Sequence, residues 1–80
     1  MNIDFSHMKT AAQLQADKYE GDLEIVRAAR RAAYQSESDP LRLEIAYDAL
    51  NEGLNPDFTA WVASVAAIKA RYPLPDQPVD

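Results

Sequence analysis

The residues that could carry out chemistry in this sequence are few, and they lack the arrangements that catalysis needs. The chain has no cysteine and a single histidine, His7, which excludes thiolate nucleophiles, cysteine metal sites and two-histidine zinc motifs. Serines are present, but His7 stands alone near the N-terminus and completes no nucleophilic triad with them. The two glycines, Gly21 and Gly53, are too widely separated to form a phosphate-binding loop.

Carboxylate pairs are the remaining candidates for general acid–base catalysis. Asp17 and Asp22 are near neighbours in the sequence, as are Asp48 and Glu52. Such pairs need burial and a cleft to move their pKa values into a catalytic range, and both pairs fall on predicted helix surfaces. We therefore expect no enzyme activity, no cofactor, no bound metal and no small-molecule substrate.

The charge balance argues against nucleic acid as a partner. The net charge is −5, whereas a nucleic-acid-binding protein normally carries a basic face. Arg27, Arg30 and Arg31 form the one local excess of positive charge, and Asp22 and Glu24 lie close enough in sequence to offset it. We predict a solvated helix face with paired charges, or contacts from Arg27 and Arg31 to acidic groups of a partner.

The length and the apolar content of the chain limit the number of domains and the compartments in which the protein can function. Eighty residues make one domain, and a domain of this size gains much of its stability from docking or oligomerisation. No apolar run approaches the roughly 18 residues of a membrane span. The opening MNIDFSHMKT lacks the charged start and apolar core of a signal peptide, so we expect an intracellular protein without a membrane partner.

Helix-favouring residues dominate from about residue 10 to residue 36. Thr10 and Gln13 have the spacing of a capping box, in which two side chains satisfy free backbone amides at a helix start. Gly21 is about 1 kcal/mol less favourable than alanine in a helix interior, and it marks a point where the helix would kink or break. We predict one long N-terminal helix over this range.

The apolar residues of this helix alternate in steps of four and three, which is the spacing of a coiled-coil seam. The seam consists of Ala12, Ala16, Tyr19, Leu23, Val26, Arg30 and Ala33. Ile25, Ala29 and Ala32 form a second, neighbouring stripe. Two stripes make a wide contact face, which either packs on the protein's own remaining helices or forms a seam between copies of the chain.

A second helix is predicted over about residues 40–52. Asp39 is placed to accept hydrogen bonds from the free amides at its start, and Pro40 suits the first helical position, where no donor is needed. Gly53 supplies the left-handed residue that closes a helix. The apolar residues line two adjoining sides: Leu43, Ala46, Tyr47 and Leu50 on one, and Leu41 and Ile45 on the other.

A third helix is predicted over about residues 56–71, with Asn55 as its cap and Pro56 at its first position. Phe58 and Trp61 have the spacing of a buried helix face, so we expect both in the core. The link between the second and third helices is about three residues long, which forces an antiparallel hairpin. The predicted fold class is all-α, with the long N-terminal helix packed on this C-terminal hairpin.

The chain divides into an N-terminal docking segment (1–9), a helical domain (10–72) and an extended proline-rich tail (73–80). We expect the front half of the long helix to project and to bind other chains through its apolar residues. The residues predicted to form this partner-binding surface are Ile3, Phe5, Leu14, Tyr19, Leu23 and Val26.

The sequence VRAARRAAYQSESDPLRLEIAYDALNEGLNPDFTAWVASVAAIKARYPLP, from Val26 onward, resembles a module common in small proteins of tailed bacteriophages. Its recurring elements are an arginine-rich helix end, a Glu-Ser-Asp-Pro-Leu turn and a tryptophan helix that closes in Ile-Lys-x-Arg-Tyr-Pro. The matching positions are Arg27, Arg31, residues 37–41, Trp61 and residues 68–73. The module is also similar to the C-terminal part of phage tail-fibre assembly proteins, which usually carry an aromatic residue in place of Pro40.

The resemblance implies a phage protein without catalysis that belongs to the tail or its fibres. It would be found in the virion tail or the host cytoplasm, and its partners would be other tail proteins or copies of itself, with a trimer expected if it follows the fibres. The alternative is a small phage-encoded inhibitor that binds and disables a host protein. An acidic, cysteine-free helical chain suits that role equally well.

Overall fold

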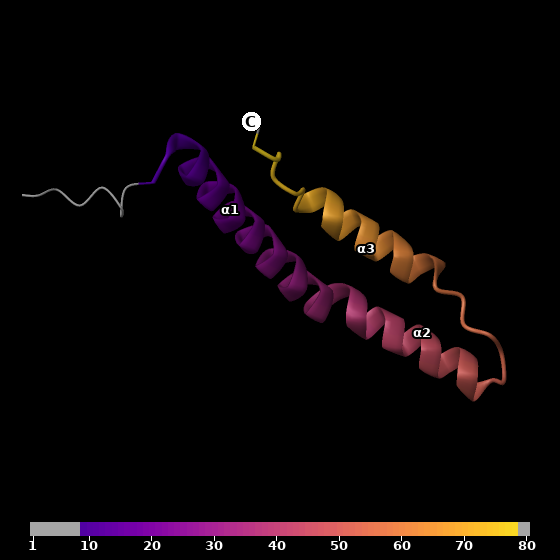
Figure 1. The fold of residues 1–80 in the computed structure, drawn as a ribbon. Helices are drawn as coiled ribbons and strands as arrows, with labels where there is room; N and C mark the ends of the chain where they lie inside the picture. Colours follow the sequence, from indigo (N-terminus) through magenta and orange to yellow (C-terminus); the bar gives the residue numbers. More distant parts are fainter. Residues whose placement is uncertain (1–8, 79–80) are drawn as a thin grey trace, which may run out of the picture.

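The computed structural model describes residues 9–78, and all regular secondary structure within them is helical (Figure 1). The elements are α1 (Ala11–Ala33), the π-helical segment η2 (Tyr34–Ser38), α2 (Asp39–Asn51) and α3 (Thr59–Arg71). α1, η2 and α2 follow one another without interruption and make one long helix, while α3 folds back beside it in the opposite direction (Figure 1). The prediction of an all-α fold is confirmed.

α1 begins with the predicted capping box. The hydroxyl of Thr10 accepts from the backbone N–H of Gln13 at 3.1 Å, and the side chain of Gln13 accepts from the N–H of Thr10 at 2.9 Å. These bonds satisfy amides that a helix start otherwise leaves unpaired. The helix then continues through Gly21 without a break, because a cost of about 1 kcal/mol is small beside the helix preference of its neighbours.

The structure differs from the prediction at residues 37–41, where a turn between two helices is expected. Asp39 has helical backbone angles, and its N–H donates to the carbonyl of Tyr34, five residues back. It therefore lies inside the long helix and does not cap a new one. A proline ring clashes with the carbonyl four residues before it. The wider π turn relieves this clash at Pro40, so the helix continues where a regular α-helix would stop.

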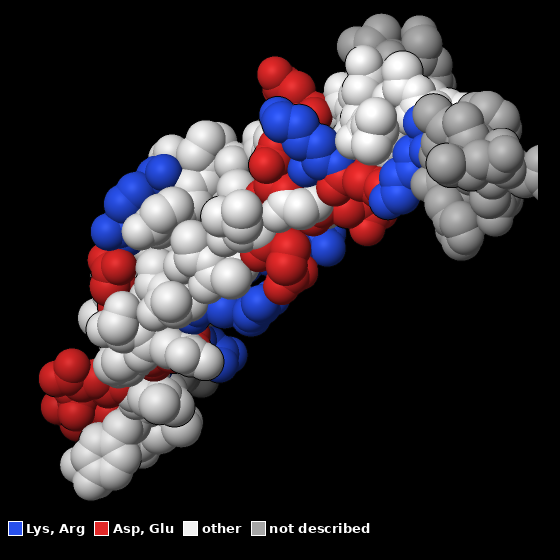
Figure 2. Space-filling view, turned by 90° about the vertical axis from the view of Figure 1, so that its left-hand side faces the viewer, with Lys and Arg blue, Asp and Glu red and all other residues white. Residues whose placement is uncertain are grey.

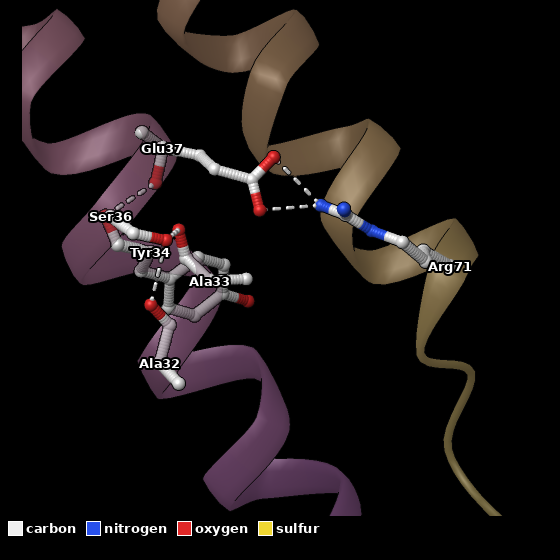
Figure 3. A network of polar contacts seen from close by, with 7 residues as sticks. Ala32, Ala33, Tyr34, Ser36, Glu37 and Arg71 are labelled. Atoms are coloured by element: carbon white, nitrogen blue, oxygen red, sulfur yellow. Dashed lines mark hydrogen bonds and ion pairs between the residues drawn. The ribbon is translucent and has the colours of Figure 1, made fainter.

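Serine hydroxyls bind backbone carbonyls around the π segment. The hydroxyl of Ser36 donates to the carbonyls of Ala32 and Ala33 at 3.1 and 3.4 Å (Figure 3). Ser38 is fully buried, and its hydroxyl donates to the carbonyl of Tyr34 at 3.4 Å. Side-chain bonds of this kind compete with the regular backbone ladder and favour a local distortion of the helix.

The π segment also determines which side of α2 meets α3. One extra residue in a turn rotates every later side chain by roughly a quarter of a turn, since each residue of an α-helix advances about 100°. The part-buried Leu41 and Ile45 of α2 thereby lie on the same side as the buried Ala33 of α1. α3 contacts η2, α1 and α2 together along this line.

Gly53 closes α2 as predicted, following the last helical residue, Asn51, and the C-cap Glu52. Gly53 has a φ of 74°, and its N–H donates to the carbonyl of Leu50 at 3.1 Å. The N–H of Leu54 donates to the carbonyl of Ala49 at 2.8 Å. The two bonds form a Schellman motif, which satisfies the last carbonyls of the helix and reverses the chain direction.

α3 begins at Thr59, three residues later than predicted. Its N-cap residue is Phe58 in place of Asn55, and Phe58 makes no side-chain capping bond; the side chain of Asp57 binds the first residue of the helix. The carboxylate of Asp57 accepts from the hydroxyl of Thr59 at 2.5 Å and from its N–H at 3.0 Å. These bonds, the side-chain one foremost, lower the pKa of Asp57 below its ordinary value. Their stabilisation is present at neutral pH and is lost as the pH falls through the lowered, folded-state pKa.

Two arginines attach α3 to the long helix. The Nε of Arg30 donates to the carbonyl of Tyr72 at 2.9 Å, and its terminal nitrogen donates to that of Lys69 at 3.4 Å. The end of a helix leaves such carbonyls without intrahelical donors. Arg71 donates to both carboxylate oxygens of Glu37 at 3.0 and 2.9 Å (Figure 3), which raises the pKa of Arg71. The contact of Arg30 with the end of α3 explains why an arginine occupies a position in the apolar seam of α1.

The molecule is long and thin. The helix over residues 11–51 measures about 61 Å at 1.5 Å per residue. The radius of gyration is 20.8 Å, against about 12 Å for a compact chain of this length. Ala33, Ser38 and Ile68 are the buried residues in the described part of the chain, so the core is confined to the place where α3 crosses the π segment.

Gly21→Ala should stabilise α1. A Cβ at this position meets no atom within 4 Å, and alanine is about 1 kcal/mol better than glycine in a helix interior. Amide hydrogen exchange in α1 should slow about fivefold. Gly53→Ala is the control with the opposite sign, because a φ of 74° strains a residue with a Cβ. Unchanged exchange in the first variant would contradict a continuous helix.

Arg30→Lys should reduce the free energy of unfolding by about 1–2 kcal/mol, because lysine cannot reproduce both bonds to the end of α3. Urea unfolding followed by the fluorescence of Trp61, the single tryptophan, measures the change. Arg27→Lys is the matched control at an exposed position of the same helix and should change the value by less than about 0.5 kcal/mol. Equal losses in the two variants would show that Arg30 does not anchor α3.

Candidate protein-binding surface

The residues predicted to bind partners fall in different environments. Ile3 and Phe5 lie outside the described residues. Leu14 is 56% exposed near the free end of α1. It therefore remains available for contact with another chain, as the prediction requires.

Tyr19, Leu23 and Val26 are part-buried on one side of α1. Their spacing leads on to Arg30, which binds the end of α3, and to Ala33, which is 6% exposed. This side of α1 therefore faces α3 and the tail. Of the two interpretations of the seam, packing on the protein's own helix accounts for its C-terminal half.

The tail lies beside the N-terminal half of the same side. Its described part, residues 73–78, has no regular secondary structure, as its prolines predict. A shallow groove of about 360 Å³ separates it from α1 and is lined by Gln15, Lys18, Tyr19, Asp22, Asp76 and Pro78. Its walls are largely exposed charged and polar side chains, whereas small-molecule sites are mostly apolar and enclose their ligand.

Several exposed large apolar side chains lie together on α2 and just beyond its C-terminal end. The four residues Leu43, Tyr47, Leu50 and Leu54, here called the outer stripe, are 68, 69, 66 and 58% exposed. They follow one another in steps of four, three and four residues. Leu43 is two residues from both Leu41 and Ile45, which places it on nearly the opposite side of the helix. Leu43, Tyr47 and Leu50, the three residues of the outer stripe that lie on α2, therefore face away from α3, and Leu54 follows the end of the helix.

The predicted partner-binding surface includes none of the outer-stripe residues, although the sequence shows apolar residues on two sides of this helix. α2 has two apolar sides, and one short helix, α3, is available to cover them. Ile25 on α1 and Val62 on α3 are also 69% and 56% exposed. Monomeric soluble proteins rarely expose contiguous apolar patches larger than a few hundred Å². The surface therefore has the composition of a protein-binding site.

Phe58 and Trp61 pack on the long helix and are part-buried. Their rings meet edge to face, with centroids 6.1 Å apart at 73°. The guanidinium of Arg42 lies 5.2 and 5.1 Å from the two ring centroids, a cation–π geometry that contributes about 0.5–1 kcal/mol at an exposed site. Both rings are expected in the core, but they are only part-buried, because a single helix covers them.

A small cavity of about 250 Å³ adjoins the π segment. It is lined by Tyr34, Ser38, Asp39, Trp61, Val65 and Lys69. The indole Nε1 of Trp61 is buried and has no hydrogen-bond partner among the described residues. The cavity is below the roughly 300 Å³ at which ligand pockets begin, so we assign it to imperfect packing between α3 and the π segment.

Charged side chains of both signs are interspersed along α1. Arg31 pairs with Glu24 at 3.1 Å and Lys18 with Asp22 at 3.4 Å. Figure 2 shows acidic and basic groups side by side toward the end that carries the grey residues, and an uncharged surface over the middle of that face with charged groups along its edges. Arg27 and Arg31 are exposed, as expected for a solvated helix face, whereas the part-buried Arg30 departs from that prediction because it binds the end of α3.

The described residues contain no group of three or more His, Cys, Asp or Glu side chains placed to hold a metal ion. The pKa shifts of Asp57 and Arg71 arise from hydrogen bonds at exposed helix ends. None of the helices in residues 9–78 combines the length and the apolar character needed to cross a membrane.

Comparison with known proteins identified no relative of this chain. The chain matches no protein-family model, and no curated protein or solved structure is significantly similar to it.

Proposed function

We propose that this protein acts without catalysis, by binding other protein chains as a structural or assembly component. The observation that carries the proposal is the outer stripe, in which Leu43, Tyr47 and Leu50 each expose about two-thirds of their surface. Removing apolar surface from water contributes about 25 cal/mol per Å² and is the main driving force of association. These side chains gain that contribution only when another molecule covers them.

The long helix gives the exposed residues a fixed arrangement. Leu14 lies near one end and the outer stripe near the other, along a rod of about 61 Å. Arg30 of the long helix binds the end of α3, and Arg71 of α3 binds Glu37 in the π segment. These two contacts hold α3 against the rod at the π segment. A braced rod with apolar residues toward both ends is suited to joining two neighbours in an assembly.

The setting we propose is the tail of a bacteriophage. The resemblance of the sequence from Val26 to Pro73 to a phage module supports this setting, and the outer stripe supports the binding role within it. Neither observation depends on the other. A binding role outside a virion, such as disabling a host protein, would use the same surface.

Quantitative mass spectrometry of purified virions tests the tail role. We expect the wild-type chain at a fixed copy number relative to the major tail protein. The variant Leu43→Glu should reduce that copy number at least tenfold, because it places a charge in the binding surface, while its helix content by circular dichroism stays unchanged. Glu44→Gln is the control on the adjoining exposed position and should be incorporated normally.

Absence of the wild-type chain from virions would reject the tail role. Recovery of the chain in a stoichiometric complex with a host protein would then favour the inhibitor. Equal incorporation of both variants would show that the outer stripe is not the binding surface.

A further inference from the structure

Most of the net negative charge of the protein lies on α2 and on the loop that follows it. Residues 39–57 contain five acidic residues and a single basic one, Arg42, which gives a net charge of −4 out of the −5 of the whole chain. The rest of the sequence is therefore nearly neutral. Figure 2 shows acidic groups beside uncharged surface at the end of the molecule farthest from the grey residues. The outer stripe thus lies in the acidic part of the molecule.

The carboxylates of α2 have no counter-charge within the described part of the chain. Among residues 9–78, the ion pairs lie on α1 and at its start, or join α3 to the π segment. The last turn of α2 contains no basic residue, whereas that of α3 contains Lys69 and Arg71. Positive charge is favourable at the C-terminal end of a helix. The end of α2 is therefore a place where a cationic side chain of another molecule would be stabilised.

Two of these carboxylates, here called the acidic edge, follow the outer stripe along one side. Glu44 comes directly after Leu43, and Asp48 comes directly after Tyr47, so each lies about 100° around the helix from a stripe residue. Both are exposed. On the other side of the stripe, Arg42 packs on aromatic rings at the start of α3. A molecule that covers the stripe therefore meets carboxylates along its open side.

We propose that the outer stripe and the acidic edge bind an amphipathic helix of another protein, in which lysine or arginine residues flank an apolar stripe. This inference rests on the proposed binding function and names the chemistry of its partner. The steps of four and three residues between Leu43, Tyr47 and Leu50 are those at which the side chains of two packed helices interdigitate. The ring of Tyr47 also offers a face on which a cationic side chain is attracted.

Charge and geometry argue against other occupants. Nucleic acids and anionic membranes carry negative charge, which the carboxylates repel. A metal ion needs several converging ligands, and the described residues contain no such group. The eight residues before Lys9 span at most about 29 Å when fully extended, whereas Ala11 and Leu43 are about 48 Å apart along the helix. The N-terminal residues of the same chain therefore do not reach the stripe.

Two designed peptides test the chemistry of the partner. Each is a helix of about 14 residues, or four turns, with leucines along one side, and the remaining positions are lysine in one peptide and glutamate in the other. Titration of the isotope-labelled full chain, followed by NMR, measures both affinity and location. At low salt the lysine peptide should bind at least tenfold more tightly than the glutamate peptide and should shift the amide signals of residues 43–51. About 0.5 M salt should reduce this preference, because it screens exposed charges.

Charge reversal of the acidic edge tests the site. Glu44→Lys combined with Asp48→Lys should weaken binding of the lysine peptide at least tenfold. Glu20→Lys combined with Asp76→Lys is the matched control, because it makes the same change in net charge at exposed positions outside α2, and its effect should be below about twofold. Glu44→Gln removes one exposed charge and should change the affinity by only about twofold, so it still serves as the control for incorporation into virions.

The apolar part of the surface is tested by Leu50→Glu, which keeps the acidic edge. This variant should also lose binding of the lysine peptide, because it places a carboxylate within the stripe. The position is 66% exposed, so the fold should be retained, as circular dichroism will show. Unchanged binding would mean that the peptide is held by charge alone and would overturn the inference.

Equal affinity for the two peptides would overturn the inference, as would equal losses in the charge-reversed variant and its control. Signal shifts confined to α1 would do the same. None of these results would remove the proposed binding function, which the copy number in virions tests separately. A chain without preference for the lysine peptide, whose incorporation still depends on Leu43, would have a partner that lacks basic residues.

Discussion

Pro40 imposes the constraint on which the rest of the structure depends. It lies inside a helix, where it donates no hydrogen bond and its ring conflicts with the carbonyl four residues back. The π segment over residues 34–38 relieves this conflict and lets the helix continue. It also rotates α2 by roughly a quarter of a turn, which places Leu41 and Ile45 in line with Ala33. Without that rotation α3 would meet the apolar side of α1 or of α2, but not both.

The same rotation leaves the other apolar side of α2 in solvent. α3 covers one side of the long helix, and the small core around Ile68 is the result. Eighty residues arranged in a single layer bury too little apolar surface to be strongly stable alone. The exposed apolar residues of α2, such as Tyr47, therefore add nothing to the stability of the single chain, and they would add to it only if another molecule covered them.

Features that depend on one helical turn are predictable from the sequence, and features that depend on distant contacts are not. The Thr10 capping box and the closing Gly53 are confirmed, because each involves neighbours within a few residues. Asp39 and Asn55 are good capping residues in positions where the chain does not use them. A π turn removes the need for the first. At the start of α3 the N-cap position is taken by Phe58 in place of the second, and Asp57 binds Thr59. Arg30 looks like a flaw in an apolar seam until the carbonyls of α3 are located beside it.

The candidate surface is harder to predict than the fold, because helical periodicity identifies apolar sides without saying which of them is covered. Tyr19, Leu23 and Val26 form a regular stripe, yet their side of α1 is the one that faces α3 and the tail. Which side of α2 is covered depends on the rotation at the π segment, which no periodic pattern reveals. A comparison of apolar sides with the helices available to cover them is more informative. α2 has two such sides and α3 covers one, so the remaining side stays exposed, and it is this exposed side that the proposed binding function uses.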